Sequence, residues 1–253
     1  MVKIALIGYG RMGKTIETIA RQKGHDITAI IDPHCPGCRP EINQGNLADV
    51  DVCLDFTHPH GVVENIRQMA RLGKKMVIGT TGWYDQLDEV KKIVEQNHGG
   101  LIWSGNFSIG VNVLFRIIEH AAKLINRLDD YDVLAHEFHH KNKADSPSGT
   151  AMMLGKILVD NVDRKKKLVF DQLNRKIAPD ELHFSSSRGG AIPGTHMILF
   201  DSAVDTIEIK HTARGREDFA AGAIMAAEFI QAKTGFYTID DLMEGIIGGV
   251  TQH

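Results

Sequence analysis

A glycine-rich turn lies between a predicted strand and a predicted helix near the start of the chain. It follows the apolar run Lys3–Ile7 and precedes a helical pattern over Met12–Lys23. The turn consists of Gly8, Tyr9, Gly10, Arg11, Met12 and Gly13. Its first glycine permits a tight bend, its second leaves room for a pyrophosphate, and its third lets the helix pack closely on the strand. The N–H groups at the helix start attract an anion. This pattern is typical of a dinucleotide-binding βαβ unit.

Asp32 stands at the end of the second predicted strand, Asp26–Ile31. At this position a carboxylate can accept hydrogen bonds from the hydroxyls of an adenosine ribose. The same charge repels the 2′-phosphate of NADPH, and Pro33 brings no cation to compensate. The sequence therefore predicts a nicotinamide cofactor with NADH favoured, although Arg11 in the turn can meet a phosphate and leaves NADPH open. The alternative to a dinucleotide site is a glycine-rich turn without a ligand and an acidic residue on the surface.

Strand-like runs alternate with helical patterns up to Trp103, which is typical of a parallel sheet built from βαβ units. The further predicted elements are strands at Val52–Asp55, Met76–Ile78 and Leu101–Trp103, a helix after Pro59, and a helix over Asp85–Gln96. Ligands of an open parallel sheet bind at the carboxyl ends of its strands. The loops at those ends supply the candidate cofactor contacts Gly79, Thr80, Thr81, Ser104, Gly105, Asn106 and Phe107.

The pattern changes after Phe107. The predicted elements there are a helix over Val111–Leu128, a strand over Tyr131–Phe138, a helix over Ala151–Val159, an antiparallel hairpin within 196–211 and a small-residue helix over Phe219–Ala232. The charge run Asp163–Lys167 is predicted to be a solvated helix end. No linker rich in flexible residues separates the two regions.

The densest group of reactive side chains lies between residues 136 and 150. It contains His136, His139, His140, Lys141 and Lys143, followed by Ser148, Gly149 and Thr150. On a strand, His139 and His140 would point to opposite faces, so both enter one site only if the strand ends there. A histidine in a cleft exchanges a proton near neutral pH, and Lys143 can hold a carboxylate or feed a proton. Ser148 opens a helix whose first N–H groups can seat an anion.

A metal centre is one alternative for this cluster, because His136, His139 and His140 offer nitrogen ligands and Glu137 offers a carboxylate. The lysines of the same loop disfavour a divalent cation, and neither a helical His-Glu-x-x-His motif nor a cysteine ligand set is present. We therefore predict no metal. A surface loop that is rich in histidine and lysine by chance is the other alternative.

The composition excludes several classes of partner. The chain has 29 Lys and Arg against 32 Asp and Glu, so no global positive field exists to bind nucleic acid. Its apolar runs are too short to cross a membrane and no signal-peptide pattern opens it, so we expect a cytoplasmic protein. Cys35 and Cys38 imitate a redox Cys-x-x-Cys motif, but no tryptophan precedes them, and we predict two loop thiols.

These segments together resemble the 4-hydroxy-tetrahydrodipicolinate reductase family, also called dihydrodipicolinate reductases, over nearly the whole length. The most specific match is the motif Glu137-x-His139-His140-x-x-Lys143-x-Asp145-x-Pro147-Ser148-Gly149-Thr150-Ala151. The glycine turn and the segments Asp55–Thr57, Gly79–Gly82 and Asn106–Val111 match as well. The resemblance implies an NAD(P)H-dependent oxidoreductase that reduces 4-hydroxy-tetrahydrodipicolinate to tetrahydrodipicolinate with loss of water, in lysine and diaminopimelate biosynthesis.

The resemblance also assigns roles to individual residues. It implies that His139 handles the proton, that Lys143 is catalytic, and that His140, Gly149 and Thr150 bind a small dicarboxylate substrate. It further implies a Rossmann-type dinucleotide-binding domain over 1–108, rejoined by 216–253. The segment 109–215 would form a smaller α+β domain whose mixed sheet serves substrate binding and assembly of a homotetramer.

Two departures from the family pattern concern the cofactor, because many members have one more residue in the glycine turn and a basic residue where Pro33 stands. Arg188 belongs to a segment that resembles a family loop near the substrate, and we leave it outside the predicted site.

Two other functions stay open: a different two-domain Rossmann dehydrogenase acting on an amino or hydroxy acid, and a non-catalytic NAD-sensing protein.

Overall fold

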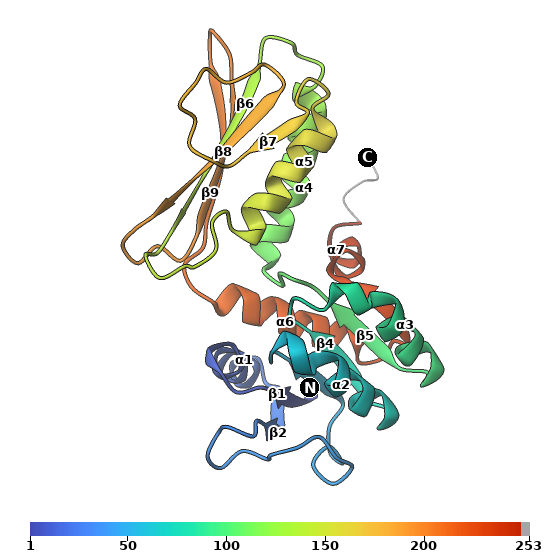
Figure 1. Cartoon of the computed structure of the whole chain (residues 1–253). Coiled ribbons are helices and arrows are strands. Elements are labelled where there is room, and N and C mark those ends of the chain that lie inside the picture. The colour runs from blue at the N-terminus through green and yellow to red at the C-terminus, as the bar shows by residue number, and fades with distance from the viewer. Residues whose placement is uncertain (249–253) are drawn as a thin grey trace. The chain divides into compact units, whose positions relative to one another are not determined.

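The computed structural model describes residues 1–248, and the chain divides into two compact units (Figure 1). Unit 1 comprises residues 1–109 and the segment from Arg216 onward, and unit 2 comprises Gly110–Gly215. Residues 249–253 of the predicted first domain lie outside the described residues. None of the described helices has the length and apolar character needed to cross a bilayer.

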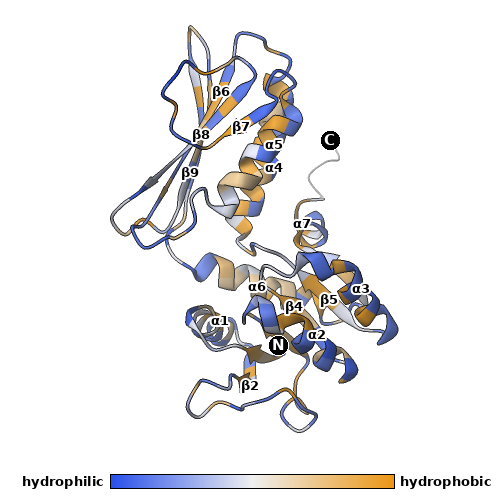
Figure 2. Cartoon of the chain, viewed as in Figure 1, coloured by the Kyte–Doolittle hydropathy of each residue, from blue (hydrophilic) through white to orange (hydrophobic). Residues whose placement is uncertain are grey.

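Unit 1 is built on a six-stranded sheet in the order β11-β5-β4-β3-β1-β2, in which every strand pair is parallel. The strands are β1 (Lys3–Ile7), β2 (Asp26–Ile31), β3 (Val52–Asp55), β4 (Lys75–Ile78), β5 (Gly100–Trp103) and β11 (Gly235–Thr238). In Figure 2, β4 and β5 are predominantly apolar, because strands covered on both faces must be apolar on both. The predicted Rossmann-type parallel sheet is confirmed.

Helices cover both faces of this sheet. They are α1 (Arg11–Gln22), α2 (Pro59–Arg71), α3 (Leu87–Gln96), α6 (Glu217–Ile230) and α7 (Ile239–Ile247), with a 3₁₀ turn at Tyr84–Gln86. Apolar residues of α2 and α3 join Ala5, Ile7 and Cys53 in one core. The helix α6 packs against β3, β4 and β5 and against α1, and it forms the other layer. This layering leaves the carboxyl ends of the strands free to build a site.

Unit 2 holds a five-stranded mixed sheet in the order β10-β9-β6-β8-β7. The strands are β6 (Asp132–His139), β7 (Lys167–Val169), β8 (Glu181–Arg188), β9 (Thr195–Asp201) and β10 (Thr206–Thr212), and the helices are α4 (Ile109–Ile125) and α5 (Gly149–Asn161). β6 runs parallel to β8 and antiparallel to β9, which pairs with β10 in the predicted hairpin. The mixed sheet and the hairpin are therefore confirmed.

Within residues 1–248, the helices α4 and α5 cover one face of the second sheet. Figure 1 shows α4 and α5 along one side, and their apolar residues join Val133, Ala135, Ile198 and Phe200 of the sheet in a second core. The period of two along β6 turns Leu134 to the opposite face, where its side chain is 44% exposed.

The prediction of a solvated helix end at Asp163–Lys167 is wrong. Helix α5 ends at Asn161, and Lys165 is buried. Its ammonium group donates hydrogen bonds to the carbonyls of Pro179 and Glu181 at 3.1 and 2.9 Å and pairs with Asp132. A charged side chain is buried here because each of its donors finds a partner, which a charge count cannot show.

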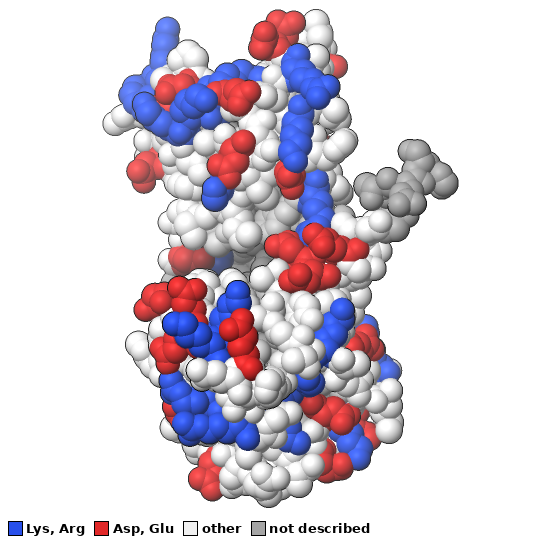
Figure 3. Space-filling model, turned by 90° about the vertical axis from the view of Figure 1, so that its right-hand side faces the viewer, with Lys and Arg blue, Asp and Glu red and all other residues white. Residues whose placement is uncertain are grey.

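The prediction of two loop thiols is also wrong, because Cys35 and Cys38 are joined in a disulfide. Over the face of the molecule drawn in Figure 3, Lys and Arg side chains are interspersed with Asp and Glu.

Candidate active site

The glycine turn and the ends of β1, β2 and β3 border a pocket of about 620 Å³ in unit 1. Gly8, Gly10 and Asp32 of the predicted cofactor contacts line it. A second pocket of about 190 Å³ is lined by Met12, Gly79, Ser104, Gly105, Asn106 and Phe107, with Phe56 and Phe219. Nine of the predicted cofactor contacts thus line one or other of these two pockets of unit 1.

Three residues of the turn and two of the Gly79 loop do not line these pockets: Tyr9, Arg11, Gly13, Thr80 and Thr81. Gly13 has a packing reason, since a Cβ on it would lie 2.4 Å from the carbonyl oxygen of Gly8. A Cβ on Gly10 would meet no atom within 4 Å, so the space in front of it is open. Helix α1 has no side-chain cap at its N-terminus, which leaves its N–H groups for an anion.

The Asp32 carboxylate is held by two backbone N–H groups, those of Tyr9 and His34, each at 2.8 Å. The hydrogen bond from Tyr9 is the main reason why the pKa of Asp32 lies below its usual value, and burial opposes it only in part. The carboxylate is therefore ionised at neutral pH, and each oxygen keeps a free lone pair for a ribose hydroxyl.

A buried carboxylate, Asp55, fixes the loop after β4. The hydroxyls of Thr80 and Thr57 donate to its Oδ1 at 2.7 Å, and the Asn65 amide donates to its Oδ2 at 2.8 Å. Burial raises the pKa of Asp55 although these hydrogen bonds oppose it. Thr80 therefore acts as an internal anchor of the loop rather than as part of a pocket wall.

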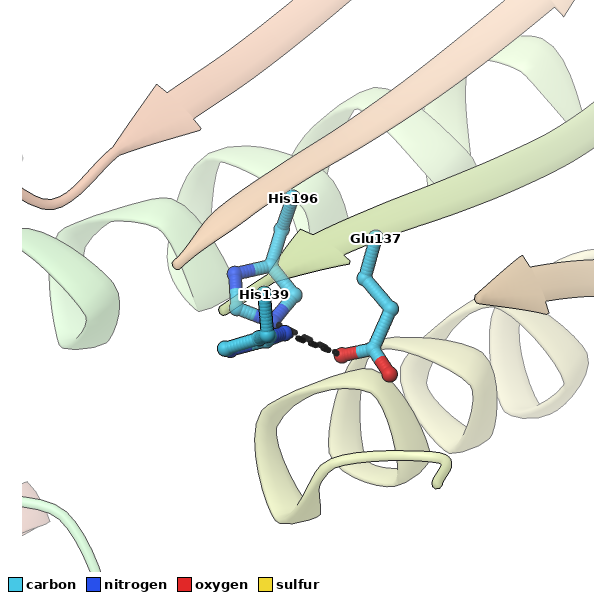
Figure 4. Close-up of side chains that lie close together, drawn as sticks. All are labelled: Glu137, His139 and His196. Atoms are coloured by element: carbon cyan, nitrogen blue, oxygen red, sulfur yellow. Dashed lines mark ion pairs between the residues drawn. The ribbon is translucent and has the colours of Figure 1, made fainter. Parts of the chain in front are cut away.

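In unit 2, His139 is the last residue of β6 and is only 6% exposed. Its Nδ1 lies 3.3 Å from Oε2 of Glu137 (Figure 4). The two side chains share a face because they are two residues apart on a strand. Burial lowers the pKa of His139 to about 4, while the Glu137 charge acts in the opposite direction. Gly194 lies beside Nε2, and a Cβ there would approach that nitrogen to 3.0 Å.

Glu137 has no exposed surface, and its Oε1 accepts three hydrogen bonds. The donors are the backbone N–H of Ser148 at 3.0 Å, the hydroxyl of Ser186 at 2.8 Å and the guanidinium of Arg188 at 2.8 Å. Burial would raise the pKa of Glu137, but His196 and these donors outweigh it and hold the pKa far below its usual value. The carboxylate is therefore ionised although it is buried.

Strand β6 ends at His139, so the chain turns directly after it. His139 and His140 could both enter one site only if the strand ended there. The backbone N–H of His140 donates to the carbonyl of Ile192 at 2.8 Å, and the N–H of Lys143 donates to the carbonyl of His140 at 3.1 Å. The Lys143 ammonium lies 2.8 Å from the Asp145 carboxylate. The turn brings Lys143 back toward the end of β6.

Helix α5 begins at Gly149, and the Ser148 hydroxyl caps it by accepting the N–H of Ala151 at 3.1 Å. Gly149 is exposed and Thr150 is partly exposed at this helix start. Since Ser148 also donates its N–H to Glu137, this N-terminus is tied to the strand that carries His139. The predicted substrate contacts of unit 2 are thus joined by hydrogen bonds within one cluster.

Glu137, His139 and His196 form a group whose donor atoms lie close enough together to hold a metal ion. The set differs from the ligands considered from sequence, because His196 replaces His136 and His140. His136 instead contacts the hydroxyls of Ser185 and Ser187. Arg188 and Lys143 place positive charge around Glu137 and His139, which disfavours a cation, and the absence of a metal stays a prediction.

Four residues of this cluster lie outside the site predicted from sequence. Glu137 was not placed beside His139, Arg188 was named but left out, and His196 and Ser186 were not singled out. Alternation along β6 could have placed Glu137 beside His139. The other three come from β8 and β9, and pairing of these strands with β6 is not encoded in any local motif.

Comparison with known proteins gives matches over both units. The family model described as the N-terminus of dihydrodipicolinate reductase matches residues 2–107, and the model of its C-terminus matches residues 110–243. A 4-hydroxy-tetrahydrodipicolinate reductase of Christiangramia forsetii is 36% identical over 245 residues, which are 97% of this chain and 99% of that protein. One of Staphylococcus aureus is 36% identical over 247 residues, covering 95% of this chain and 100% of that protein.

Solved structures show the same fold. A dipicolinate-bound dihydrodipicolinate reductase from Paenisporosarcina sp. TG-14 superposes with a TM-score of 0.76 at 24% identity, over 94% of this chain and 97% of that one. The diaminopimelate dehydrogenase of C. glutamicum superposes with a TM-score of 0.54 at 14% identity, over 99% of both chains.

Proposed function

The chain belongs to the dihydrodipicolinate reductase family, and from this premise we propose how its residues divide the work of the reaction. It is an NAD(P)H-dependent oxidoreductase that reduces 4-hydroxy-tetrahydrodipicolinate to tetrahydrodipicolinate with loss of water, a step of lysine and diaminopimelate biosynthesis. Unit 1 serves as the dinucleotide-binding domain and unit 2 as the substrate-binding and oligomerisation domain.

One observation supports this division most directly. The end of β6, the Lys143 turn and the start of α5 form one hydrogen-bonded cluster in unit 2, and unit 1 carries a glycine turn with an anchored carboxylate. These are the two parts that a nicotinamide-dependent reduction of a small dicarboxylate needs.

The pockets of unit 1 fit a nicotinamide dinucleotide. The open space at Gly10 and the uncapped start of α1 would take the pyrophosphate, and Asp32 would accept the hydroxyls of the adenosine ribose. The smaller pocket beside Ser104–Phe107 would receive the nicotinamide half. When bound, the cofactor supplies the hydride. We infer a preference for NADH, because Asp32 is ionised and a 2′-phosphate would meet its charge.

The start of α5 and the turn after β6 would hold the two carboxylates of the substrate. The N–H groups at Gly149 and Thr150 point out of a helix N-terminus, where partial positive charge favours an anion. Lys143 and His140 would add charge and hydrogen bonds, and the Lys143 ammonium must exchange its Asp145 partner for a substrate carboxylate.

His139 would then supply the proton of the reduction from Nε2, since Nδ1 faces Glu137. In the ligand-free chain its imidazole is neutral at pH 7, because its pKa is about 4. A bound dianion raises that pKa, since nearby negative charge favours the protonated ring. Substrate binding would therefore prepare the acid that the reaction uses.

Steady-state kinetics with freshly generated 4-hydroxy-tetrahydrodipicolinate and each nicotinamide tests this function, followed through the absorbance of the reduced cofactor. We expect turnover with both cofactors and a higher kcat/KM with NADH. Oxidation of NADH only with an amino acid or hydroxy acid would support the other Rossmann dehydrogenase. Cofactor binding without turnover on any substrate would indicate an NAD sensor.

We further propose a homotetramer that is assembled through the uncovered face of the second sheet. Leu134 of β6 and Leu199 of β9 are register partners on that face, and neither is covered by a helix of unit 2. Leu134→Lys should shift the mass seen by light scattering toward smaller species.

We also propose that the enzyme is located in the cytoplasm, and cell fractionation tests this.

A further inference from the structure

The carboxylate of Glu137 is linked to the start of α5 directly and to the Lys143 turn through Arg188. Through Oε1 it accepts the N–H of Ser148 at the start of α5, and through the same oxygen it binds Arg188. The Arg188 guanidinium also donates to the carbonyl of Asp145 at 2.8 Å, and the Asp145 carboxylate pairs with Lys143. One buried side chain therefore ties together the anion seat and the lysine turn.

The second oxygen of Glu137 faces two imidazoles (Figure 4). Oε2 lies 3.3 Å from Nδ1 of His139 and 3.4 Å from Nε2 of His196. Among the described residues, neither this oxygen nor Nδ1 of His139 has a hydrogen-bond partner of regular geometry, and the contact between them is an ion pair. A carboxylate only accepts hydrogen bonds, so a ring nitrogen that faces it is favoured in its N–H form.

This arrangement has a consequence for His139. With the proton on Nδ1, the neutral ring carries its lone pair on Nε2, and a second proton must be gained and lost at Nε2. If Nδ1 carried the lone pair instead, Nδ1 of His139 and Oε2 of Glu137 would be two buried acceptors facing each other with no proton between them. Nε2 is the nitrogen beside Gly194, which places no side chain of its own against it.

We propose that Glu137 is the positioning residue of this site: it holds His139 in the Nδ1–H tautomer and sets the Lys143 turn and the start of α5 around it. The proposal rests on the proton-handling role of His139 given above. Glu137 touches no substrate itself and acts through the groups that do.

The charged and titratable groups around His139 come from three strands and one turn. Glu137 lies on β6, Arg188 ends β8, His196 lies on β9, and Lys143 and Asp145 lie in the turn before α5. Glu137 raises the pKa of His139, whereas His196, Lys143 and Arg188 lower it. Removal of the Glu137 charge therefore makes His139 a weaker base, and removal of His196 makes it a stronger one.

The isosteric variant Glu137→Gln tests the proposal. We expect kcat with NADH to fall about 100-fold, which is within the range for loss of a correctly placed general acid. The pH above which kcat/KM declines should move to lower pH. The ¹⁵N shifts of the His139 ring should show a mixture of tautomers in place of a single Nδ1–H form.

Glu181→Gln is the matched control. Glu181 is another buried carboxylate of unit 2. Among the described residues, its carboxylate is paired with Arg175 at 2.8 Å and accepts the N–H of Ala178, and these partners belong to neither His139 nor the Lys143 turn. It should lower the melting temperature, because an ion pair and a hydrogen bond to the Ala178 N–H are weakened, with kcat and the pH profile unchanged. If Glu137→Gln behaves in the same way as this control, Glu137 is merely structural and the proposal fails.

His196→Asn provides an independent test with the opposite sign, should Glu137→Gln not fold. It leaves Oε2 of Glu137 to His139 and removes a group that lowers the pKa of His139, so the decline of kcat/KM should move to higher pH. No movement, or a movement to lower pH, overturns the proposal. If His139→Gln itself keeps full turnover, the role of His139 is wrong. If His139→Gln is inactive while Glu137→Gln keeps the parent kcat, tautomer and pH profile, only the positioning role is wrong.

Discussion

The backbone N–H of Tyr9 donates a hydrogen bond of 2.8 Å to the side chain of Asp32, which ties the glycine turn to the end of β2. Asp32 therefore stabilises the glycine turn, in addition to making its proposed contact with the ribose. The same hydrogen bond lowers its pKa below the usual value, so the carboxylate is charged in the neutral range. Selection of NADH should then be independent of pH in the neutral range.

Asp32→Asn should raise the ratio of kcat/KM with NADPH to that with NADH by about tenfold, the effect of removing roughly 1.4 kcal/mol of charge repulsion. The amide oxygen can still accept the Tyr9 N–H, so the turn should persist. Kinetics with both cofactors measure the ratio. Asp26→Asn, at the opposite end of β2, serves as the control, and an unchanged ratio in Asp32→Asn would show that Asp32 does not select the cofactor.

His139→Gln should lower turnover by roughly 10²–10⁴-fold and leave NADH affinity nearly unchanged, because it removes a proton donor from unit 2 only. Stopped-flow or steady-state rates and NADH titration by fluorescence measure the two quantities. His136→Gln is the control: it lies on the same strand but turns to the other face, toward Ser185 and Ser187. Equal losses in both variants would contradict a specific role for His139.

Lys143→Ala should lower turnover to a comparable degree and also weaken binding of a pyridine dicarboxylate, because the ammonium that meets a substrate carboxylate is lost. Binding of dipicolinate measured by calorimetry with NADH present reports the second effect. Lys141→Ala is the matched control, since Lys141 lies two residues away and is exposed. If dipicolinate binds Lys143→Ala as tightly as the parent, Lys143 is not an anchor.

Much of unit 1 could be predicted because its signals are local. The bounds of β1, β2 and β3 are those expected from their apolar runs, and the glycine turn lies where a strand meets a helix. The segment β11 was missed: Gly235–Thr238 is a short edge strand whose residues are all only partly buried. Its pairing with β5 supplies the stability that its own sequence does not indicate.

The site in unit 2 could be predicted only in part. His139, Lys143, Gly149 and Thr150 lie on one continuous motif, so their proximity follows from chain connectivity. Arg188 and His196 reach the same place through β8 and β9, which pair with β6 on opposite sides. Their partners are set by strand order, and strand order depends on tertiary packing rather than on local pattern.

Binding of dipicolinate should take up protons near pH 6–7, because His139 is neutral in the free enzyme, with a pKa of about 4, and a dianion beside it raises that pKa. By linkage, a ligand that raises a pKa binds more tightly as the pH falls. Calorimetric titration in buffers of different ionisation enthalpy gives the number of protons taken up. We expect a positive number that rises from pH 8 to pH 6 and falls in His139→Gln, with Lys141→Ala as the control.

Proton release, or the same uptake in His139→Gln, would show that another group titrates. Since the Glu137 charge assists protonation of His139, uptake in Glu137→Gln should lie below that of the parent.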